Sequence, residues 1–336
     1  MTRRIAFAYD CKEDYLEAGF SPQEVMEFDG ALTIGGIAAA LRGLGHLVDR
    51  VGSGVELARR LAAGERWDLV FSIAEGVRGR SREAQVPALC ELFDQPYVFS
   101  DPLTCALTLD KALAKRVVRD CGVPTAPFAV VSDPAQARTV SLPPPLFVKP
   151  VAEGSSKGVT ARSLVHSSSE LEEVCAGLLA QFRQPLLVES FLPGREVTVG
   201  VVGSGGHARV LGIMEVIFTS SAEAEAYTAV NKGEYEHRVQ YKLLSGEPLS
   251  WQAETYALAA YRALGCRDAG RVDLRCDSAG VPNFLEINPL PGLDPDRSDL
   301  PILTRLSGRS FSWLLGEILH SAEERAGHSG RKNPAA

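Results

Sequence analysis

The chain has 336 residues, a length that suggests two or three domains, and 45% of them are hydrophobic while 23% are charged. This composition is typical of a globular protein and excludes a disordered chain, a collagen-like repeat and a coiled coil. The formal net charge of −7 lacks the basic excess that binding to nucleic acid normally requires, so we expect no nucleic-acid partner.

The seven cysteines are odd in number and include no pair at CxxC spacing. We therefore expect reduced, mostly buried thiols rather than disulfides or a zinc site. The apolar stretch near the start is too short for a secretory signal, and no window approaches the ~18 apolar residues of a membrane span. These features predict a cytoplasmic protein that does not associate with a membrane.

Strands and helices alternate over the N-terminal part of the sequence. Hydrophobic periodicity predicts strands at 4–9, 47–51, 69–72 and 97–99, and helices at 32–44, 54–63 and 83–93. Strands that are separated by helices pair in parallel through right-handed crossovers. This part is therefore predicted to be an open α/β sheet.

The pattern changes after a predicted helix at 109–121, which ends at Gly122-Val123-Pro124. Later strands are predicted at 128–131, 146–149, 159–162, 186–190, 272–276 and 283–286, a hairpin at 196–202 and 208–218, and helices at 171–181, 251–264 and 311–325. The polar end of the chain is expected to be disordered.

The strongest chemical signal is a pair of neighbouring strands with polar residues two apart. Arg271 and Asp273 lie on one strand, and Glu286 and Asn288 on the next, so each pair faces one side of its strand. Two carboxylates and an amide oxygen are ligands that suit Mg²⁺. The alternative interpretation is a salt-bridge ladder at the surface.

Two further stretches suggest nucleotide binding. Lys149 ends an apolar strand before a small-residue loop at 153–158, whose backbone N–H groups could close on a polyphosphate. Glu189 and Glu196 flank a turn, and a Glu can accept hydrogen bonds from an adenine amino group or ribose hydroxyls. The alternatives are a flexible hairpin for the loop and two solvated acids for the turn.

In order and spacing, these motifs resemble the D-alanine–D-alanine ligases of the ATP-grasp superfamily. The resemblance runs from residue 69 to about 301, and its matching elements are a helix–strand unit from Gln85 to Asp101, Asp110-Lys111, Val148-Lys149-Pro150, Glu189 to Glu196, and Arg271 to Gly292. It implies an α/β fold, α+β in its C-terminal parts, with an N-terminal open parallel sheet. It also implies domains at 1–108, 109–190 and 191–326, and a disordered tail at 327–336.

The resemblance also implies roles for individual residues. ATP would contact Lys111, Lys149, Glu153, Ser156, Glu189 at the adenine amino group, Leu192 through its backbone, and Glu196 at the ribose. Two Mg²⁺ ions, which Mn²⁺ can replace, would bind Asp273, Glu286 and Asn288. Catalytic roles would fall to Arg271, the N–H of Gly292, Ser155 and Lys232, and substrate contacts to Glu27, Glu75 and Ser298.

The expected substrate residues depart from the family pattern. Glu75 stands where the family has His, Arg80 and Ser81 replace an acidic pair, and Ser298 is followed by Asp299 instead of Leu. These changes predict substrates that differ, at least in part, from two D-alanines. The alternative is that Glu75 pairs with neighbouring arginines and never meets the substrate.

The sequence thus predicts an ATP-dependent carboxylate–amine ligase that forms a peptide or amide bond through an acyl phosphate. The alternatives are a ligase of the same chemistry that makes another dipeptide or a natural-product amide, and a nucleotide-binding regulator without turnover. The partners would be small amino acids or amines, and self-association as a homodimer is left open. The stretch 219–241 is expected to close over the site.

Overall fold

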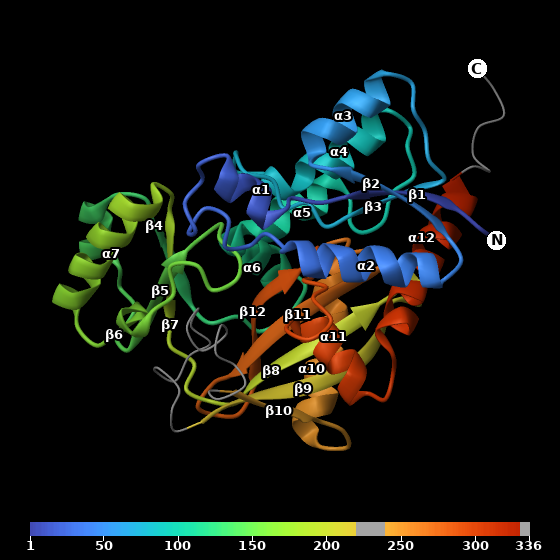
Figure 1. Ribbon diagram of the computed structural model, residues 1–336. Coiled ribbons are helices and arrows are strands. Elements are labelled where there is room, and N and C mark those ends of the chain that lie inside the picture. The colour runs from blue at the N-terminus through green and yellow to red at the C-terminus, as the bar shows by residue number, and fades with distance from the viewer. Residues whose placement is uncertain (220–238, 330–336) are drawn as a thin grey trace.

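The computed structural model describes residues 1–219 and 239–329, and in this part the chain folds around three β-sheets (Figure 1). Lys232 and most of the stretch expected to close over the site lie outside the described residues.

The N-terminal sheet is parallel, as predicted, with the order β2-β1-β3. It consists of β1 (Arg4–Ala8), β2 (Leu47–Gly52) and β3 (Leu69–Ser72), and an unpredicted short helix, α1 (Lys12–Glu17), follows β1. On one face of this sheet lies α2 (Ala31–Gly43), and on the other lie α3 (Gly54–Ala62) and α4 (Gln85–Leu92). The strand expected at 97–99 is reduced to one bridge between Val70 and Tyr97.

A four-stranded antiparallel sheet with the order β4-β7-β5-β6 forms the middle of the chain. Its strands are β4 (Phe128–Val131), β5 (Leu146–Pro150), β6 (Leu164–Val165) and β7 (Leu186–Ser190), and α7 (Ser168–Phe182) packs against them. The strand predicted at 159–162 is wrong. The Thr160 side chain caps a 3₁₀ turn, η3 (Ala161–Ser163), and that turn delays the strand to Leu164.

The third sheet is antiparallel and has the order β10-β9-β8-β11-β12. Its strands are β8 (Glu196–Val202), β9 (Arg209–Phe218), β10 (Val239–Leu243), β11 (Ala269–Cys276) and β12 (Pro282–Asn288). One face packs against α10 (Pro248–Ala263) and α6 (Lys111–Asp120), and the other against α11 (Asp299–Leu306). Every residue of β8 and β11 is buried, because helices cover both faces.

The helix predicted at 109–121 corresponds to α6, and an unpredicted helix, α5 (Pro102–Leu109), ends just before it, so that the two meet at Asp110. This residue ends α5, and its carboxylate accepts a hydrogen bond from the Leu113 backbone N–H at 3.0 Å, which caps α6. The cap fixes where Lys111 stands relative to the rest of the chain.

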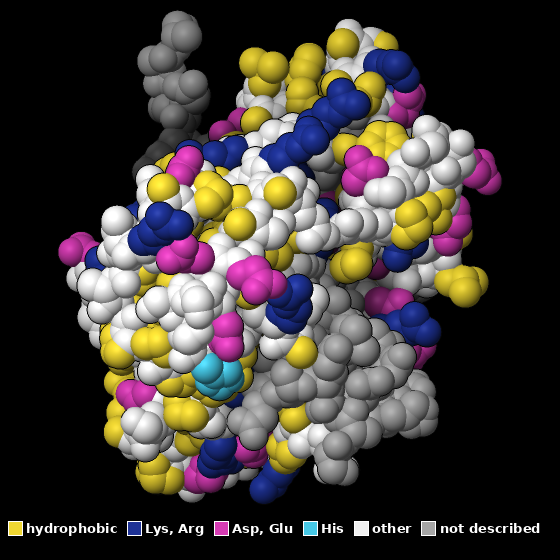
Figure 2. Space-filling view, turned by 90° about the vertical axis from the view of Figure 1, so that its left-hand side faces the viewer, with side chains coloured by type: hydrophobic (Ala, Val, Ile, Leu, Met, Phe, Trp, Pro, Cys, Tyr) yellow, Lys and Arg dark blue, Asp and Glu magenta, His cyan; other side chains and the backbone are white. Residues whose placement is uncertain are grey.

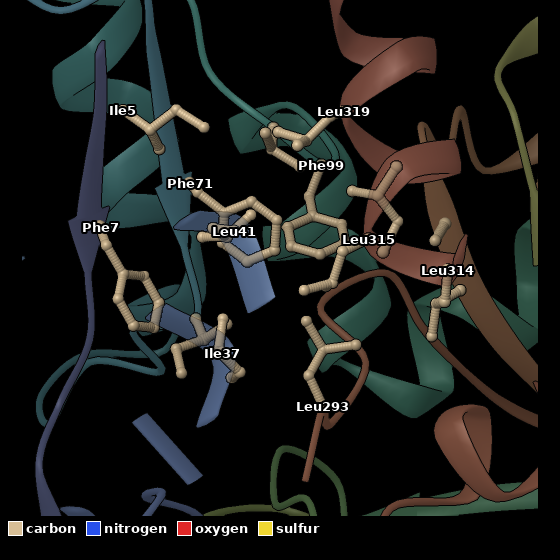
Figure 3. Packing of buried hydrophobic residues seen from close by; sticks show 14 of the residues in the cluster. Ile5, Phe7, Ile37, Leu41, Phe71, Phe99, Leu293, Leu314, Leu315 and Leu319 are labelled. Atoms are coloured by element: carbon tan, nitrogen blue, oxygen red, sulfur yellow. The ribbon is translucent and has the colours of Figure 1, made fainter. Parts of the chain in front are cut away.

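The last helix, α12 (Phe311–Ser329), packs beside α2 against the N-terminal sheet. In Figure 3, the side chains of Phe71 on β3, of Phe99 after α4 and of Leu315 on α12 point toward one another. The ring centroids of Phe71 and Phe99 are 5.6 Å apart. The helix continues through residues 327–329, so the predicted disordered tail is wrong over that segment; residues 330–336 lie outside the described part.

Each sheet lies within one of the three predicted domain ranges, but two helices pack across the boundaries. α6 packs on the third sheet and α12 on the first, so both helices join parts that the prediction separates. The division at 1–108, 109–190 and 191–326 stays a prediction.

All seven cysteines are free, and six of them are buried, as expected. Within the described residues, no helix combines the length and the apolar character needed to cross a membrane.

Figure 2 shows Lys and Arg side chains interspersed with Asp and Glu on the face that carries α7.

Candidate active site

Two cavities meet inside the molecule. The first lies between the two antiparallel sheets, and the second, of about 950 Å³, lies between the N-terminal part and the segment that follows β12. The residues that line both cavities are Lys111, Glu153, Ser155, Arg271 and Glu286. Every site residue predicted from the sequence lines one or both cavities, except Lys232, which lies outside the described residues.

Two lysines hold the Glu189 carboxylate in the floor of the first cavity. Lys149 ends β5 and places its Nζ 2.8 Å from Glu189 Oε1, while Lys115 of α6 places its Nζ 2.8 Å from Oε2. Lys115 is fully buried and also donates to the Phe284 carbonyl at 2.8 Å. The cluster of two cations and one anion leaves one positive charge in excess.

These ion pairs shift the pKa values of the cluster. Burial alone would raise the pKa of Glu189, but Lys115 and Lys149 outweigh it and lower that pKa to about 2. For Lys149 burial opposes the charged form, yet Glu189 and Glu286 raise its pKa. For Lys115 burial prevails and lowers the pKa. Glu189 therefore stays ionised throughout the neutral range, and Lys149 remains a cation at the cavity wall.

Lys115 was not among the residues predicted from the sequence. One signal was available: Lys115 stands four residues after Lys111, on the same face of a helix, in a chain with few lysines. Lys111 itself is buried at the junction of the cavities, where it donates to the Glu153 carbonyl and lies 3.4 Å from Glu286 Oε2.

The outer part of the first cavity is mostly apolar, with one buried acid. Phe147, Leu192 and Leu285 line it. Glu196 accepts a hydrogen bond from Arg275 Nη1 at 3.0 Å, and burial raises the pKa of Glu196 to about 6 against the opposing charge of Arg275. Such a pocket suits a flat ring with a polar edge.

The paired strands β11 and β12 gather the predicted polar residues, as the alternation implied. Asp273 stands directly opposite Glu286, and Arg271 opposite Asn288. Arg271 donates two hydrogen bonds to the Asp273 carboxylate, with Nε 3.0 Å from Oδ1 and Nη2 2.9 Å from Oδ2. Burial raises the pKa of Asp273. The positive charge of Arg271 opposes this rise, and the negative charge of the nearby Glu286 adds to it.

Arg271 also binds a carboxylate that the sequence analysis did not pair with it. Its Nη1 lies 2.7 Å from Oδ2 of Asp299, the fully buried first residue of α11. From the sequence, the negative charge of Asp299 was expected near the substrate, where Lys232 or Arg297 could compensate it. The structure shows that Asp299 holds Arg271 instead.

Asp273, Glu286 and Asn288 form a donor set that fits a hard cation. The Glu286 side chain is 25% exposed at the junction of the cavities, and the Asn288 amide nitrogen has no hydrogen-bond partner among the described residues. In the same part of the chain, no three His, Cys, Asp or Glu side chains are grouped as a metal site. A cation held here would therefore take further ligands from phosphate or water, as Mg²⁺ commonly does.

The loop between β5 and η3 is held against the N-terminal part. Ser155 and Ser156 adopt the left-handed region, with φ of 47° and 57°. Glu27 accepts a hydrogen bond from the Gly154 N–H, and Arg82 Nη2 donates to its other oxygen at 2.9 Å. Glu27 thus lines the second cavity, but both of its oxygens are already engaged.

Three other carboxylates line the second cavity without a partner in the described part of the chain. Neither a hydrogen bond nor an ion pair from these residues reaches the side chains of Asp29, Glu75 or Glu83. Burial raises the pKa of Glu75, that of Glu83 to about 7, and that of Asp29 to about 6. The neighbouring arginines do not pair with Glu75: Arg80 binds Asp110, and Arg82 binds Glu27.

Gly292 and Ser298 are packed together at the far wall of the second cavity. A Cβ atom on Gly292 would lie 2.7 Å from Ser298 Oγ, so any larger residue there would displace the serine hydroxyl. Ser298 Oγ accepts a hydrogen bond from the Asp294 N–H at 3.1 Å, which closes the turn before α11.

Comparison with known proteins now defines the class of enzyme. The family model described as D-ala D-ala ligase C-terminus matches residues 117–320. The D-alanine–D-alanine ligase of Bordetella petrii is 35% identical over an alignment of 286 residues that covers 82% of this chain and 82% of that one.

Two solved structures share the fold. The D-alanine–D-alanine ligase from Bacillus anthracis complexed with ATP has a TM-score of 0.74 at 20% identity, covering 98% of this chain and 100% of that one. The VanG D-Ala:D-Ser ligase from Enterococcus faecalis has a TM-score of 0.68 at 21% identity, covering 96% and 100%.

The chain belongs to the D-alanine–D-alanine ligase family and has its ATP-grasp fold. The predicted family, the predicted fold class and the predicted class of enzyme, an ATP-dependent ligase that forms a peptide bond, are confirmed.

Proposed function

We propose that this chain uses ATP to join a carboxylate to an amine where its two cavities meet. The observation that carries the proposal is the set of residues that line both cavities, above all Lys111, Arg271 and Glu286. A nucleotide in the first cavity would present its terminal phosphate to a carboxylate in the second. Reactants held in this way react as if in one molecule.

The first cavity offers the chemistry that a nucleotide needs. Its apolar wall with Leu192 suits the adenine ring, and Glu196 suits ribose hydroxyls. Lys149 supplies the excess positive charge for the phosphates, and the loop with Ser155 and Ser156 can bring backbone N–H groups onto them. Glu189, with its oxygens held by lysines, would orient Lys149 as well as face the adenine amino group.

The proposed reaction has two steps. An oxygen of the substrate carboxylate attacks the γ-phosphorus of ATP, the bond to the bridging oxygen breaks, and ADP leaves. The amine nitrogen of the second substrate then attacks the acyl carbon, the bond to the phosphate oxygen breaks, and the nitrogen gives up a proton. The products are an amide, ADP and inorganic phosphate.

Asp273, Glu286 and Asn288 would hold Mg²⁺, which would neutralise charge on the transferring phosphoryl group. Arg271, fixed by Asp273 and Asp299, together with the Gly292 N–H, would stabilise the negative oxygen of the tetrahedral intermediate. Because carboxylates hold Arg271 in place, little reorganisation is needed during the reaction.

Phosphate release from ATP, measured with mixed L- and D-amino acids and small amines, tests the proposal. Hydroxylamine added to the reaction should trap the acyl phosphate as a hydroxamate. Nucleotide binding without phosphate release under any of these conditions would favour the alternative, a regulator without turnover.

The predicted cytoplasmic location and the homodimer stay predictions. Light scattering on the purified chain would determine its mass in solution, and the calculated mass of one chain is 36.1 kDa.

A further inference from the structure

We propose that the substrate whose carboxylate is activated is a basic amino acid, with its side-chain cation bound by Glu75 and Glu83 in the second cavity. This inference rests on the proposed function, and it names the substrate class that the same site would select.

Glu75 and Glu83 are half-buried carboxylates that lack a hydrogen-bond or ion-pair partner among the described residues. Their side chains line the cavity wall, where little solvent reaches them, and no cation of the described chain lies against them. Buried charges are normally paired, because an unpaired one is costly. Here the missing partner would come from a ligand.

The cations near these two carboxylates are already engaged elsewhere. Arg82, the cation that acts most strongly on both carboxylates, donates to Glu27 at 2.9 Å and to the Ala152 carbonyl at 2.9 Å. Lys111 reaches toward Glu286 instead. Within the described part of the chain, the protein therefore does not neutralise Glu75 and Glu83 with its own side chains.

Acidic side chains outnumber basic ones in the lining of the second cavity. Among the described residues, ten acidic side chains and four basic ones line it. Some of these acids already have a cationic partner, as Glu27 has in Arg82 and Glu153 has in Lys157, whereas Glu75 and Glu83 have none among the described residues. A side-chain cation of the substrate would meet Glu75 or Glu83 while the carboxylate stays at the junction.

The size of the cavity agrees with such a substrate. The cavity of about 950 Å³ is at the upper end of the range for ligand pockets and leaves room for a long side chain.

The test compares lysine with norleucine, which has the same chain length and no side-chain charge. Phosphate release is measured with both enantiomers of each, alone and paired with alanine as the amine. We expect kcat/KM for one enantiomer of lysine to exceed that for norleucine at least tenfold, and ornithine or arginine to behave like lysine.

Variants assign the preference to the two carboxylates. Glu75→Gln and Glu83→Gln should each lower the ratio of kcat/KM for lysine over norleucine at least fivefold. Glu254→Gln, on the exposed face of α10, is the matched control and should leave the ratio unchanged.

Calorimetric titration of the wild-type chain separates this inference from the proposed function. Lysine should bind at least tenfold more tightly than norleucine, whether or not phosphate is released. Equal binding, or a kcat/KM for alanine or norleucine that matches lysine, overturns the inference and leaves the proposed ligase chemistry standing. Tighter binding of lysine without phosphate release under any condition supports the cation site and counts against the proposed function.

Discussion

Replacing Lys115 with Met should destabilise the protein strongly, although Lys115 does not line either cavity. Lys115 is fully buried and makes two interactions that nothing else in the described structure replaces: one with Glu189 Oε2 and one with the Phe284 carbonyl. Methionine fills much of the same volume, so the change removes an ion pair and a hydrogen bond rather than packing.

The size of the effect follows from these two interactions. Breaking a buried ion pair costs about 3–5 kcal/mol, and Lys149 still holds the other Glu189 oxygen, so the lower end applies. The unpaired Phe284 carbonyl adds about 1–3 kcal/mol. We expect a loss of about 4 kcal/mol in the free energy of unfolding, which lowers the Tm by roughly 5–10 °C.

Urea denaturation and calorimetry measure this loss. Arg119→Met, an exposed change on the same helix, is the control and should stay within about 0.5 kcal/mol of wild type. Adding Glu189→Gln to Lys115→Met should cost less than the sum of the single changes, because the two residues share one ion pair. A Lys115→Met protein within about 1 kcal/mol of wild type would refute the reasoning, since the buried pair would then contribute nothing.

Three further changes test other parts of the site. Glu286→Ala should abolish turnover and leave the fold intact, and Asp273→Ala and Asn288→Ala should do the same. A near-native rate of phosphate release for Glu286→Ala would contradict the metal assignment. Lys149→Met should weaken binding of a non-hydrolysable ATP analogue more than Lys157→Met, because Lys149 is fixed at a strand end whereas Lys157 pairs with Glu153 in the loop; equal losses of affinity in a titration would count against this ranking. Glu83→Gln should raise the Tm above pH ~7. The pKa of Glu83 is raised from 4.5 to about 7 by burial, so its ionisation lowers stability as pH rises through that window. An equal Tm for wild type and variant near pH 5 and near pH 8 would contradict the burial of this charge.

The polar cluster on β11 and β12 could be predicted from the sequence better than the elements around it. Strand alternation places Arg271 and Asp273 on one side of β11, and the register with β12 then brings Glu286 opposite, so local periodicity was sufficient. The helix α11 was not predicted. Its residues from Asp299 to Thr304 are all buried, so the sequence lacks the polar face that marks an amphipathic helix.

Long-range partners could not be predicted from local patterns. Nothing near Asp299 in the sequence indicates that it binds an arginine on β11, because the fold alone brings them together. The same holds for Lys115, whose partner lies on β7. Glu27 was predicted to contact the substrate, but its hydrogen bond to the Gly154 N–H depends on how the loop meets the N-terminal part.

The packing of α12 beside α2 has a consequence for synthesis on the ribosome. One face of the N-terminal sheet is covered by α3 and α4 as soon as they emerge, but the other face contacts Leu314, Leu315 and Leu319, which follow much later in the sequence. Domains generally fold in order as they leave the ribosome. Here Phe71 and its neighbours stay partly exposed to solvent until α12 has been synthesised. A chain truncated before α12 should therefore be retained by chaperones or degraded.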